Sequence, residues 1–557
     1  MTADYIIVGA GSAGCVLANR LSADPAVSVL LIEAGGPDRN PAIHIPAAYG
    51  QLHGSSVDWG YWTEPQPGVD NRRMYQPRGK TLGGSSSTNA MAYVRGNRLD
   101  YDDWAALGNR GWSYADVLPY FIRSEHNEQF DQLDTAYHGN SGPLNVTFAQ
   151  HFRTPLASAF VTSCQQIGLP RNDDYNGRKQ EGTGYFQFTI RNARRHSAAA
   201  AFLKPALNRP NLRVITQAHT HQIVCRNDVA IGIDFSIGKR PVQRAEARRE
   251  VILAAGAFNS PQLLMLSGIG PADELRQHGI DCRLNLPGVG QNLQDHVMTG
   301  VSSLCTQAIS ANSSLKPLNL FRAMMQYMVS KKGPLTMSPL EANAFTWVDG
   351  ATDRPNMQLH FTPVHIGDDY VGDMYDASTF PKTDGYTILP TLLKPKSRGT
   401  VKLRSASPLD TPLIDPQYLT HDDDVRVLLA GVRQAIAVME ADAFGAYRKR
   451  LQTPPDCASD DTILRHIRRQ LETVYHPVGT CKMGNDALAV VDDQLRVRGI
   501  DGLRVVDASV MPTIVSGNTN APVIMIAEKA ADLILGNPPA QPISHSQPST
   551  QPVYRPL

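Results

Sequence analysis

The N-terminal residues contain a glycine pattern that narrows the choice of fold more than any other feature of the chain. An apolar run over residues 5–8 leads into Gly9, Gly11 and Gly14 and then a helical pattern, which predicts a strand, a tight turn and a helix. In such a unit Gly9 permits the turn, Gly11 lets a pyrophosphate approach the backbone, and Gly14 lets the helix pack closely on the strand. A second predicted strand leads to Glu33, whose carboxylate can bind a ribose diol and repels a 2′-phosphate. The pattern therefore predicts a Rossmann-like domain that binds FAD or NAD rather than NADP.

Length and composition exclude several classes of protein. A chain of 557 residues exceeds one ordinary core, so at least two domains are expected. Lys and Arg (53) nearly balance Asp and Glu (52), which disfavours a nucleic-acid partner. The seven cysteines are scattered without a CxxC pair, which disfavours a disulfide framework and a zinc site and favours a reducing compartment. With no expected signal peptide or membrane-spanning segment, we expect a cytoplasmic protein, with peripheral membrane contact left open.

The stretch TVYHPVGTCKMG places His476 beside an aromatic residue and close to Cys481. A single histidine in an apolar segment is most often a packed core residue, so a structural role, a catalytic base and a metal ligand are all considered. No further ligand cluster accompanies His476 and Cys481, whereas zinc needs three or four ligands, so no metal site is predicted.

Further segments predict how the rest of the chain is organised. The stretch REVILAAGAFNSPQLLMLSGIGP predicts a strand and then a helix, with Ser260 as N-cap, Pro261 in the first turn and Gly268 at the stop. Long stretches rich in aromatic residues, Pro and Asn interrupt the Rossmann-like pieces and predict a second domain inserted in segments. The last residues are rich in Pro, Gln and Ser and poor in core residues, which predicts a disordered tail.

Several stretches in order resemble the glucose-methanol-choline (GMC) oxidoreductases, in particular their choline dehydrogenase and alcohol dehydrogenase-like branch. RGKTLGGSSSTNAMAYVRG and GAFNSPQLLMLSGIGP are similar to the first and second signatures of the family, and PKSRGTVKLRSASPLDTPLIDPQYL, YHPVGTCKMG and LRVVDASVMPTIVSGNTNAPVIMIAEKAADLI follow. The resemblance implies a Rossmann-like α/β FAD-binding domain with an inserted α+β substrate-binding domain built on an antiparallel sheet. The predicted division is an FAD-binding domain (1–155, 205–310 and 475–536), a substrate-binding domain (156–204 and 311–474) and a tail (537–557).

The resemblance also implies the residues that bind FAD. In relatives with covalently bound flavin a histidine in the first signature forms the bond, and Thr88 stands at that position here, so non-covalent FAD is expected. The implied FAD-binding residues are Gly9, Gly11, Gly14, Glu33, Ser85, Asn89, Ala90, Thr220, Asp507, Ala508 and Pro522.

By the same resemblance, His476 is the catalytic base and Asn520 orients the alcohol oxygen while a hydride moves to flavin N5. Neutral imidazole can accept the hydroxyl proton, and an amide can donate a hydrogen bond to the developing oxyanion without competing for that proton. A helix is predicted directly after Asn520, with Pro522 in its first turn and Gly536 at its end, so that its positive end faces the flavin.

The implied activity is FAD-dependent oxidation of a primary aliphatic, aryl or choline-like alcohol to an aldehyde, with oxygen or a quinone or other electron carrier as acceptor. Val474, Tyr475, Glu341 and Trp59 are candidates for the substrate pocket, where core aromatics and a salt-bridged glutamate are the alternative interpretation. Two other functions are kept open. One is a non-redox relative with the same fold, of the hydroxynitrile lyase or fatty-acid photodecarboxylase type, and the other is an NAD-dependent dehydrogenase that shares only the glycine motif.

Overall fold

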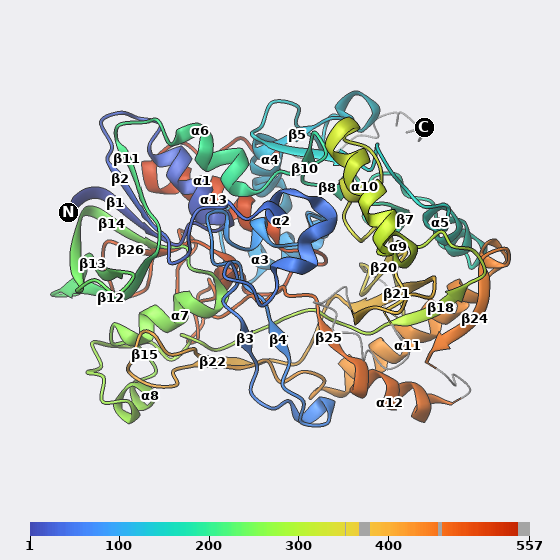
Figure 1. Ribbon diagram of the computed structural model, residues 1–557. Coiled ribbons are helices and arrows are strands. Elements are labelled where there is room, and N and C mark those ends of the chain that lie inside the picture. Colours follow the sequence, from blue (N-terminus) through green and yellow to red (C-terminus); the bar gives the residue numbers. More distant parts are fainter. Residues whose placement is uncertain (351–352, 367–378, 455–458, 544–557) are drawn as a thin grey trace.

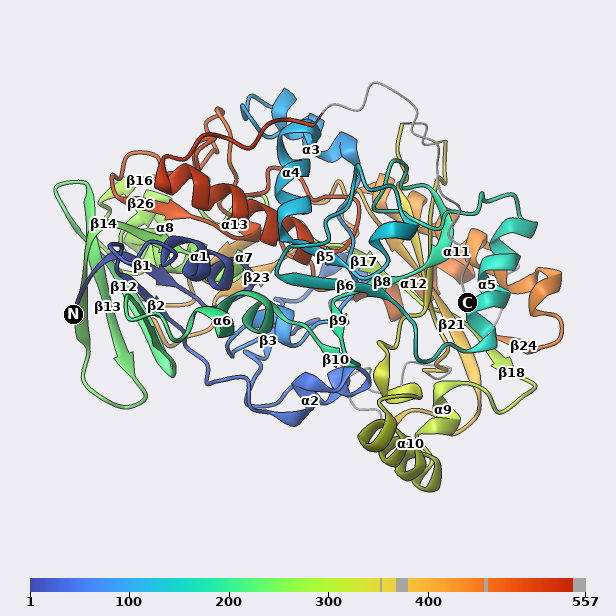
Figure 2. The same cartoon turned by 90° about the horizontal axis from the view of Figure 1, so that it is seen from above.

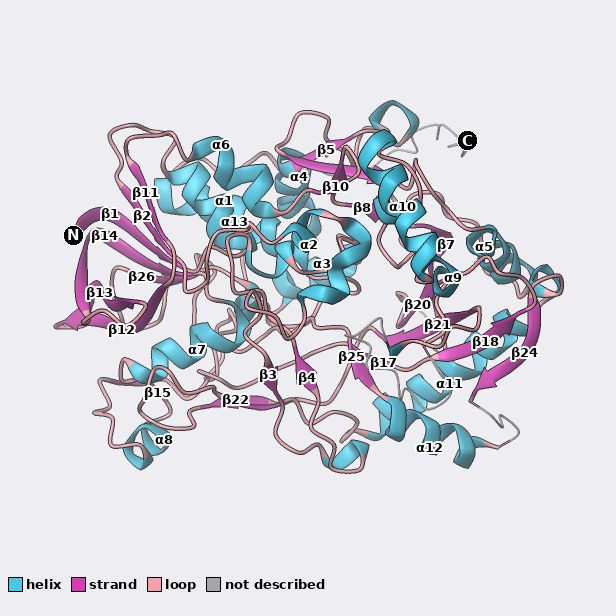
Figure 3. Cartoon of the chain, in the orientation of Figure 1, coloured by secondary structure: helices cyan, strands magenta, loops and turns pink. Residues whose placement is uncertain are grey.

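The computed structural model describes residues 1–350, 353–366, 379–454 and 459–543. The strands of these residues gather mainly in two sheets at opposite ends of the molecule, and helices α1 and α13 lie between them (Figure 1). Figure 3 shows that long irregular segments connect the two ends. This architecture agrees with the predicted combination of a Rossmann-like α/β part and a part built on an antiparallel sheet.

The first sheet contains the predicted strand, turn and helix unit. Its first two strands along the chain are almost entirely buried and mostly apolar, as expected for parallel strands covered on both faces. The parallel neighbours are β11 (Leu212–Ile215), β2 (Val29–Ile32), β1 (Thr2–Val8), β14 (Gln243–Leu253) and β26 (Leu503–Val505), and β13 (Val229–Ile237) and β12 (Ala218–Arg226) continue antiparallel from β14.

Helices α1 (Ser12–Leu21), α13 (Asn520–Leu535) and α4 (Tyr114–Ser124) pack together over this sheet (Figure 2). The fully buried carboxylate of Glu528 on α13 pairs with Arg20 of α1 at 2.7 Å and with Arg123 of α4 at 2.9 Å. A buried carboxylate needs such partners, because an unpaired charge in the interior is strongly destabilising. The pairs therefore fix α13 relative to α1, which determines where the N-termini of both helices lie.

The second sheet is antiparallel, as the resemblance implied. Its main strands run in the order β24 (Arg448–Thr453), β18 (Val301–Cys305), β21 (Gly385–Leu392), β20 (Met357–Thr362), β19 (Ala342–Thr346) and β7 (Gly182–Tyr185). Strand β17 (Val297–Met298) also pairs with β21, and β25 (Glu472–Thr473) pairs with β17. Helices α5 (Pro155–Gln166) and α11 (Asp422–Glu440) pack on one face, where Leu359 and Phe361 of β20 enter a common apolar core. Since strand residues alternate between faces, His360 and Thr362 lie on the opposite face.

The remaining described α-helices and strands lie outside the two main sheets and the group formed by α1, α4 and α13. The helices are α2 (Pro41–His44), α3 (Arg98–Ala106), α6 (Lys204–Ala206), α7 (Gly256–Leu266), α8 (Ala272–Gln277), α9 (Ala311–Ser314), α10 (Pro317–Ser330) and α12 (Asp460–Gln470). The short strands are β3 (Tyr61–Trp62), β4 (Tyr75–Gln76), β5 (Glu125–Asn127), β6 (Leu144–Phe148), β8 (Gln187–Phe188), β9 (Ile190–Arg191), β10 (Arg194–Arg195), β15 (Ile269–Gly270), β16 (Leu284–Asn285), β22 (Thr400–Lys402) and β23 (Leu413–Asp415).

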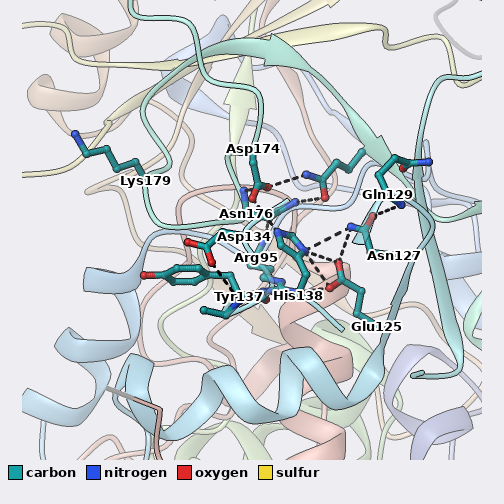
Figure 4. Close-up of polar contacts among 12 residues, drawn as sticks. Arg95, Glu125, Asn127, Gln129, Asp134, Tyr137, His138, Asp174, Asn176 and Lys179 are labelled. Atoms are coloured by element: carbon teal, nitrogen blue, oxygen red, sulfur yellow. Dashed lines mark hydrogen bonds and ion pairs between the residues drawn. The ribbon is translucent and has the colours of Figure 1, made fainter. Parts of the chain in front are cut away.

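A buried charged cluster lies just beyond α4, at the start of β5 (Figure 4). Glu125 binds Arg95 at 2.8 Å and His138 at 3.1 Å, and the other ring nitrogen of His138 lies 2.8 Å from Asp174. Burial alone would lower the pKa of His138, but the two carboxylates outweigh it and raise the pKa to about 9. His138 is therefore protonated at neutral pH and holds strand β5, which begins with Glu125, close to the loop that carries Asp174.

Several predicted boundaries differ from the structure. Helix α7 begins at Gly256, before the predicted start, and therefore contains both Ser260 and Pro261. The Ser260 hydroxyl does not cap the helix but donates to the Asp507 carboxylate (2.6 Å). The same carboxylate accepts from the Gly256 amide (2.9 Å) at the first residue of the helix. Gly268 and Gly536 follow the ends of α7 and α13 in the left-handed region, as predicted.

The division of the chain into domains stays a prediction, and two of its boundaries touch ordered elements. Strands β17 and β18 lie within the range 205–310 but pair with the second sheet. At the start of the predicted tail, the Ala540 amide donates to the Tyr120 hydroxyl (3.1 Å) and the Ile543 amide donates to the Ala115 carbonyl (3.0 Å). These two hydrogen bonds place this part of the tail against helix α4. Residues 544–557 of the tail lie outside the described residues.

Candidate active site

A cavity of about 770 Å³ extends from the glycine turn after β1 to the inner face of the second sheet. Such a volume suits an elongated ligand together with a small molecule at one end. Most of the predicted site residues line it: Gly9, Gly11, Glu33, Ser85, Asn89, Ala90, Thr220, Asp507, Ala508, Val474, Tyr475, His476, Glu341, Trp59 and Asn520. Gly14 and Pro522 do not; Gly14 instead packs so tightly on the turn that a Cβ atom would lie 1.8 Å from the Gly9 carbonyl oxygen.

The glycine turn presents open backbone to the cavity. Gly9 has a φ of +100°, and a Cβ atom there would lie 2.5 Å from the Ala254 carbonyl oxygen, so only glycine fits. At Gly11 the nearest atom to a Cβ would be 3.9 Å away, which leaves room for a ligand against the backbone at the start of α1. The geometry thus gives the turn at Gly9 a steric basis, and the binding of a pyrophosphate beside Gly11 stays a prediction.

Glu33 lies at the end of β2 with its carboxylate held by the backbone. One oxygen accepts from the amide of Ala10 and the other from the amide of Gly35, each at 2.8 Å. Burial raises the pKa of Glu33 to about 7, and the two amides oppose that shift. The carboxylate is thus fixed beside the glycine turn, where it can accept hydrogen bonds from a ligand's hydroxyls.

The other predicted FAD-binding residues surround the middle of the cavity. The Asn89 side-chain oxygen accepts from the amide of Met91 (2.9 Å) and from Arg195 (2.8 Å), which fixes its orientation. The buried hydroxyl of Thr220 has no hydrogen-bond partner in the described protein, although it lies in the cavity wall. This hydroxyl is therefore available to a ligand in the cavity, and pairing it there would offset the free-energy cost of its burial.

Trp59 stands at the Thr220 end of the cavity rather than beside His476. Its ring stacks on Tyr61 with 5.6 Å between centroids, lies 6.0 Å from the His219 ring, and has the Lys80 ammonium 4.4 Å away. Trp59 thus lies in the cavity wall beside His219 and Lys80, and its place in the substrate pocket stays a prediction.

His476 is held by its neighbours in the chain and by Asp295. The Asp295 carboxylate accepts from the His476 amide (2.8 Å) and from the hydroxyls of Tyr418 and Thr473. Tyr475, directly before His476, has a φ of +64°, a strained conformation for a residue with a side chain. Strain of this kind is typical of residues that position a functional group, and here it turns His476 towards the cavity.

A second histidine, His296, determines which ring nitrogen of His476 carries the proton. Burial lowers the pKa of His296 to about 3, so its ring is neutral, and its Nε2 donates to the Leu393 carbonyl (3.0 Å). Its Nδ1 can then only accept a hydrogen bond. His476 Nδ1 lies 3.0 Å from that atom and must donate to it, which leaves the Nε2 of His476 unprotonated.

The asparagine beside the free nitrogen of His476 is Asn518, not the predicted Asn520. Asn518 Nδ2 donates to His476 Nε2 (3.2 Å), while its buried side-chain oxygen has no partner in the described protein. Asn520 is the first residue of α13, and its side-chain oxygen accepts from the Ser12 hydroxyl (2.7 Å) at the start of α1. Asn520 thus links the N-termini of the two helices that face the cavity.

The wall beyond His476 is largely apolar. Val474 and Tyr475 line it, together with apolar side chains that include Met298, Met337, Leu340, Val364 and Leu389. Glu341 is the acidic residue at this end among the described lining residues, and its carboxylate is occupied by the amide and hydroxyl of Thr154. Burial raises the pKa of Glu341 to about 7, which further lessens its negative charge at neutral pH.

Three residues of the site, Asn518, Asp295 and His296, were not predicted from the sequence. Asn518 carries a signal, since it lies in the same GNTNAP stretch as Asn520. Asp295 and His296 carry none, because they lie about 180 residues from His476 and a lone Asp-His pair has no diagnostic spacing.

The described residues contain no group of three or more His, Cys, Asp or Glu side chains able to hold a metal ion. The buried Cys481 has a pKa well above its usual value because burial disfavours the thiolate.

Comparison with known proteins gives consistent matches along the chain. Residues 3–298 and 395–527 match the models of the N-terminal and C-terminal parts of GMC oxidoreductases. The chain is 44% identical over 540 residues to an alcohol dehydrogenase [acceptor] of Pseudomonas putida, covering 96% of this chain and 95% of that protein. It is equally 44% identical over 543 residues to an oxygen-dependent choline dehydrogenase of Brucella ovis, covering 97% and 96%. A formate oxidase variant of Aspergillus oryzae RIB40, solved to study FAD modification, superposes with a TM-score of 0.89 at 27% identity over 96% of this chain and 98% of that one.

Proposed function

Because the chain belongs to the GMC oxidoreductase family, we propose that it oxidises a primary alcohol with an apolar chain to the aldehyde, with His476 as the base. Membership in the family and the relatives named above make the protein an FAD-dependent oxidoreductase that acts on CH–OH donors. The observation that carries the proposal is the pairing of His296 with His476, which leaves an unprotonated nitrogen in the cavity.

The residues around the cavity fit FAD. The open backbone at Gly11 suits a pyrophosphate at the N-terminus of α1, Glu33 suits ribose hydroxyls, and the unpartnered Thr220 hydroxyl suits a group at the adenine side. The bound FAD supplies the acceptor for the hydride that leaves the carbinol carbon. Thr88 offers no ring nitrogen for a covalent bond, so we infer non-covalent FAD, which acid precipitation of the protein would release into solution.

His476 and Asn518 then have complementary roles toward the alcohol. When the alcohol binds, its hydroxyl replaces the Asn518 N–H as the donor to His476 Nε2, and the neutral imidazole then accepts the hydroxyl proton at that atom. Burial lowers the pKa of His476, which keeps the ring neutral at physiological pH. The Asn518 amide N–H donates to the alcohol oxygen as negative charge develops on it. Asn520, by its bond to Ser12, positions the N-terminus of α13 rather than the substrate.

The character of the wall beyond His476 favours an aliphatic alcohol over choline. A trimethylammonium group is best held by aromatic faces and an ionised acid. The acid at this end, Glu341, accepts hydrogen bonds from Thr154 and has a raised pKa, and aliphatic side chains form much of the lining at this end of the cavity. Burial of each methylene of an alkyl chain against such a wall contributes about 0.8 kcal/mol.

The test is anaerobic mixing of the FAD-loaded protein with a medium-chain alkanol, benzyl alcohol and choline, followed by admission of air. The proposal predicts that the alkanol bleaches the flavin fastest. A flavin that stays yellow with every alcohol would refute alcohol oxidation and favour a non-redox relative. The rate of recolouring in air then distinguishes oxygen from a quinone or other carrier as the electron acceptor.

A further inference from the structure

Helix α10 exposes an apolar surface that the fold does not use. Leu318, Phe321, Met328 and Val329 are 61%, 64%, 65% and 80% exposed, and Met325 between them is 46% exposed. These positions recur at helical spacing and form one face of the helix. On the surface of a soluble protein, large exposed apolar residues are normally scattered one by one. A contiguous apolar face of this kind therefore indicates an interaction site.

The concentration of exposed apolar side chains on this one segment is unusual for the molecule. Of the sixteen large hydrophobic residues that are exposed in the described chain, eight fall within residues 315–329. Figure 2 shows α10 at the edge of the molecule, outside the layers formed by the two sheets and their helices. The apolar face is therefore presented outward and is accessible to a large, flat partner.

The segment is also basic. Lys316, Arg322, Lys331 and Lys332 lie on or beside α10, and the sequence has no acidic residue between Asp295 and Glu341. None of the four forms an ion pair with an acidic residue of the described chain. Although the net charge of the whole protein is close to zero, positive charge is in local excess beside the apolar face of α10.

The helix is anchored so that it can lie on a surface but not cross it. Ala323 and Tyr327 are buried, and the Tyr327 hydroxyl donates to the Ala193 carbonyl (3.0 Å). With about 1.5 Å of rise per residue, the helix is roughly 21 Å long, shorter than the ~30 Å apolar layer of a bilayer. No helix in the described ranges is long and apolar enough to span a membrane.

The same segment forms part of the cavity wall. Leu315, Leu320 and Met324 are partly exposed and also line the cavity described above. An apolar surface thus continues from the outer face of α10 into the chamber that contains His476.

We propose that α10 is a membrane-docking helix, whose apolar face enters the interface of a bilayer that contains anionic phospholipids while the four basic residues contact the headgroups. Apolar side chains flanked by Lys and Arg, without acidic residues, are the composition that binds such interfaces. A protein partner would need a matching acidic rim as well as an apolar groove, whereas an anionic bilayer supplies both features at any position. The cavity wall at α10 then faces the membrane.

Flotation of the FAD-loaded chain with lipid vesicles tests the proposal. One set contains phosphatidylcholine with about one third phosphatidylglycerol, the other phosphatidylcholine alone, each at low and high salt. The first variant combines Phe321→Ser, Met328→Ser and Val329→Ser, and the second combines Lys316→Glu, Arg322→Glu and Lys332→Glu. The matched control is Val242→Ser with Leu409→Ser, two exposed apolar residues 55% and 70% exposed elsewhere on the molecule.

The proposal predicts that the wild-type chain and the control float with the anionic vesicles, and that both α10 variants lose at least about tenfold in binding. Flavin reduction by a water-soluble alcohol should be unchanged in the variants, which shows that they are folded. Equal binding of the serine variant and the wild type would overturn the proposal. A wild-type chain that ignores both vesicles and elutes at twice the mass of the serine variant would overturn it too, since a second copy would then cover α10.

Discussion

The Nδ1 atoms of His296 and His476 lie 3.0 Å apart, and only one of them can donate a proton to the other. The Leu393 carbonyl takes the single proton of neutral His296, so His476 is the donor in the pair. The arrangement assigns the tautomer of His476 from two fixed hydrogen bonds and leaves its Nε2 as a base. His296 therefore acts on the reaction through His476, as a positioning residue.

Replacing His296 tests this relationship. His296→Leu cannot accept from His476 Nδ1, so the rate of flavin reduction should fall by about a hundredfold, since loss of the correct histidine tautomer is known to be costly. His296→Asn retains an acceptor and should recover much of that loss. Stopped-flow absorbance measures both rates, and the FAD content of each variant serves as the control for folding. Equal rates in the leucine and asparagine variants would contradict the tautomer role.

The two asparagines of the GNTNAP stretch should behave differently. Asn518→Ala removes the donor beside His476 Nε2 and should slow flavin reduction by roughly 10²- to 10³-fold with FAD retained. Asn520→Ala removes the link to Ser12 and should mainly weaken FAD binding, with a smaller effect on the reduction rate of the loaded enzyme. Reduction rates and FAD dissociation constants separate the two effects. The reverse pattern would restore Asn520 as the residue that orients the alcohol.

The pH dependence of flavin reduction follows from the pKa of His476. Burial, together with His296, His360 and Arg78, holds this pKa well below the usual value of 6.5, and the base works in its neutral form. The rate should therefore stay level as the pH falls through 6.5 and decline only at more acidic pH. Glu341, with its pKa raised to about 7, could add an inflection of its own, so the profile is compared with that of Glu341→Gln. A decline centred near pH 6.5 in both proteins would show that His476 has an ordinary pKa.

The buried cluster around His138 predicts how stability depends on pH. The pKa of His138 is raised from 6.5 to about 9 in the folded protein, so its contribution is complete below pH 6.5 and is lost as the pH rises through 9. The contribution is at most about 3 kcal/mol, from the difference between the two pKa values. Thermal unfolding should show a lower apparent Tm at pH 9 than at pH 6.5. His138→Gln, with no proton to lose, should show a smaller change over the same interval, and an equal change in both proteins would exclude His138 as the cause.

Local spacing predicted the parts of the site that local structure determines. Gly9, Gly11 and Glu33 belong to one strand, turn and helix unit, and Gly536 ends α13 because glycine readily adopts the left-handed conformation found there. The choice between Asn518 and Asn520 depends on where α13 begins and on the hydroxyl of Ser12, about 500 residues away.

The contribution of His296 likewise depends on a strand pairing between β17 and β25 that brings residues 296 and 476 together. The sequence predicted that α7 starts after Ser260, whereas the Ser260 hydroxyl donates a hydrogen bond to Asp507, which lies in a distant segment of the chain. Short sequence motifs thus predict the cofactor-binding turn, whereas the remaining features of the site depend on contacts between segments that are far apart in the sequence.

One measurement decides whether His476 is the base that takes the alcohol proton. It is the rate of anaerobic flavin reduction by a medium-chain alkanol, compared between the wild-type chain and His476→Ala. A matched control is His221→Ala, which removes a partly exposed histidine of β12 whose ring nitrogen hydrogen-bonds to Ser236. We expect rapid bleaching in the wild type and the control, and a rate lower by about 10²- to 10⁴-fold in His476→Ala with FAD still bound. An unchanged rate in His476→Ala would show that the alcohol proton leaves by another route and would contradict the role assigned to His476.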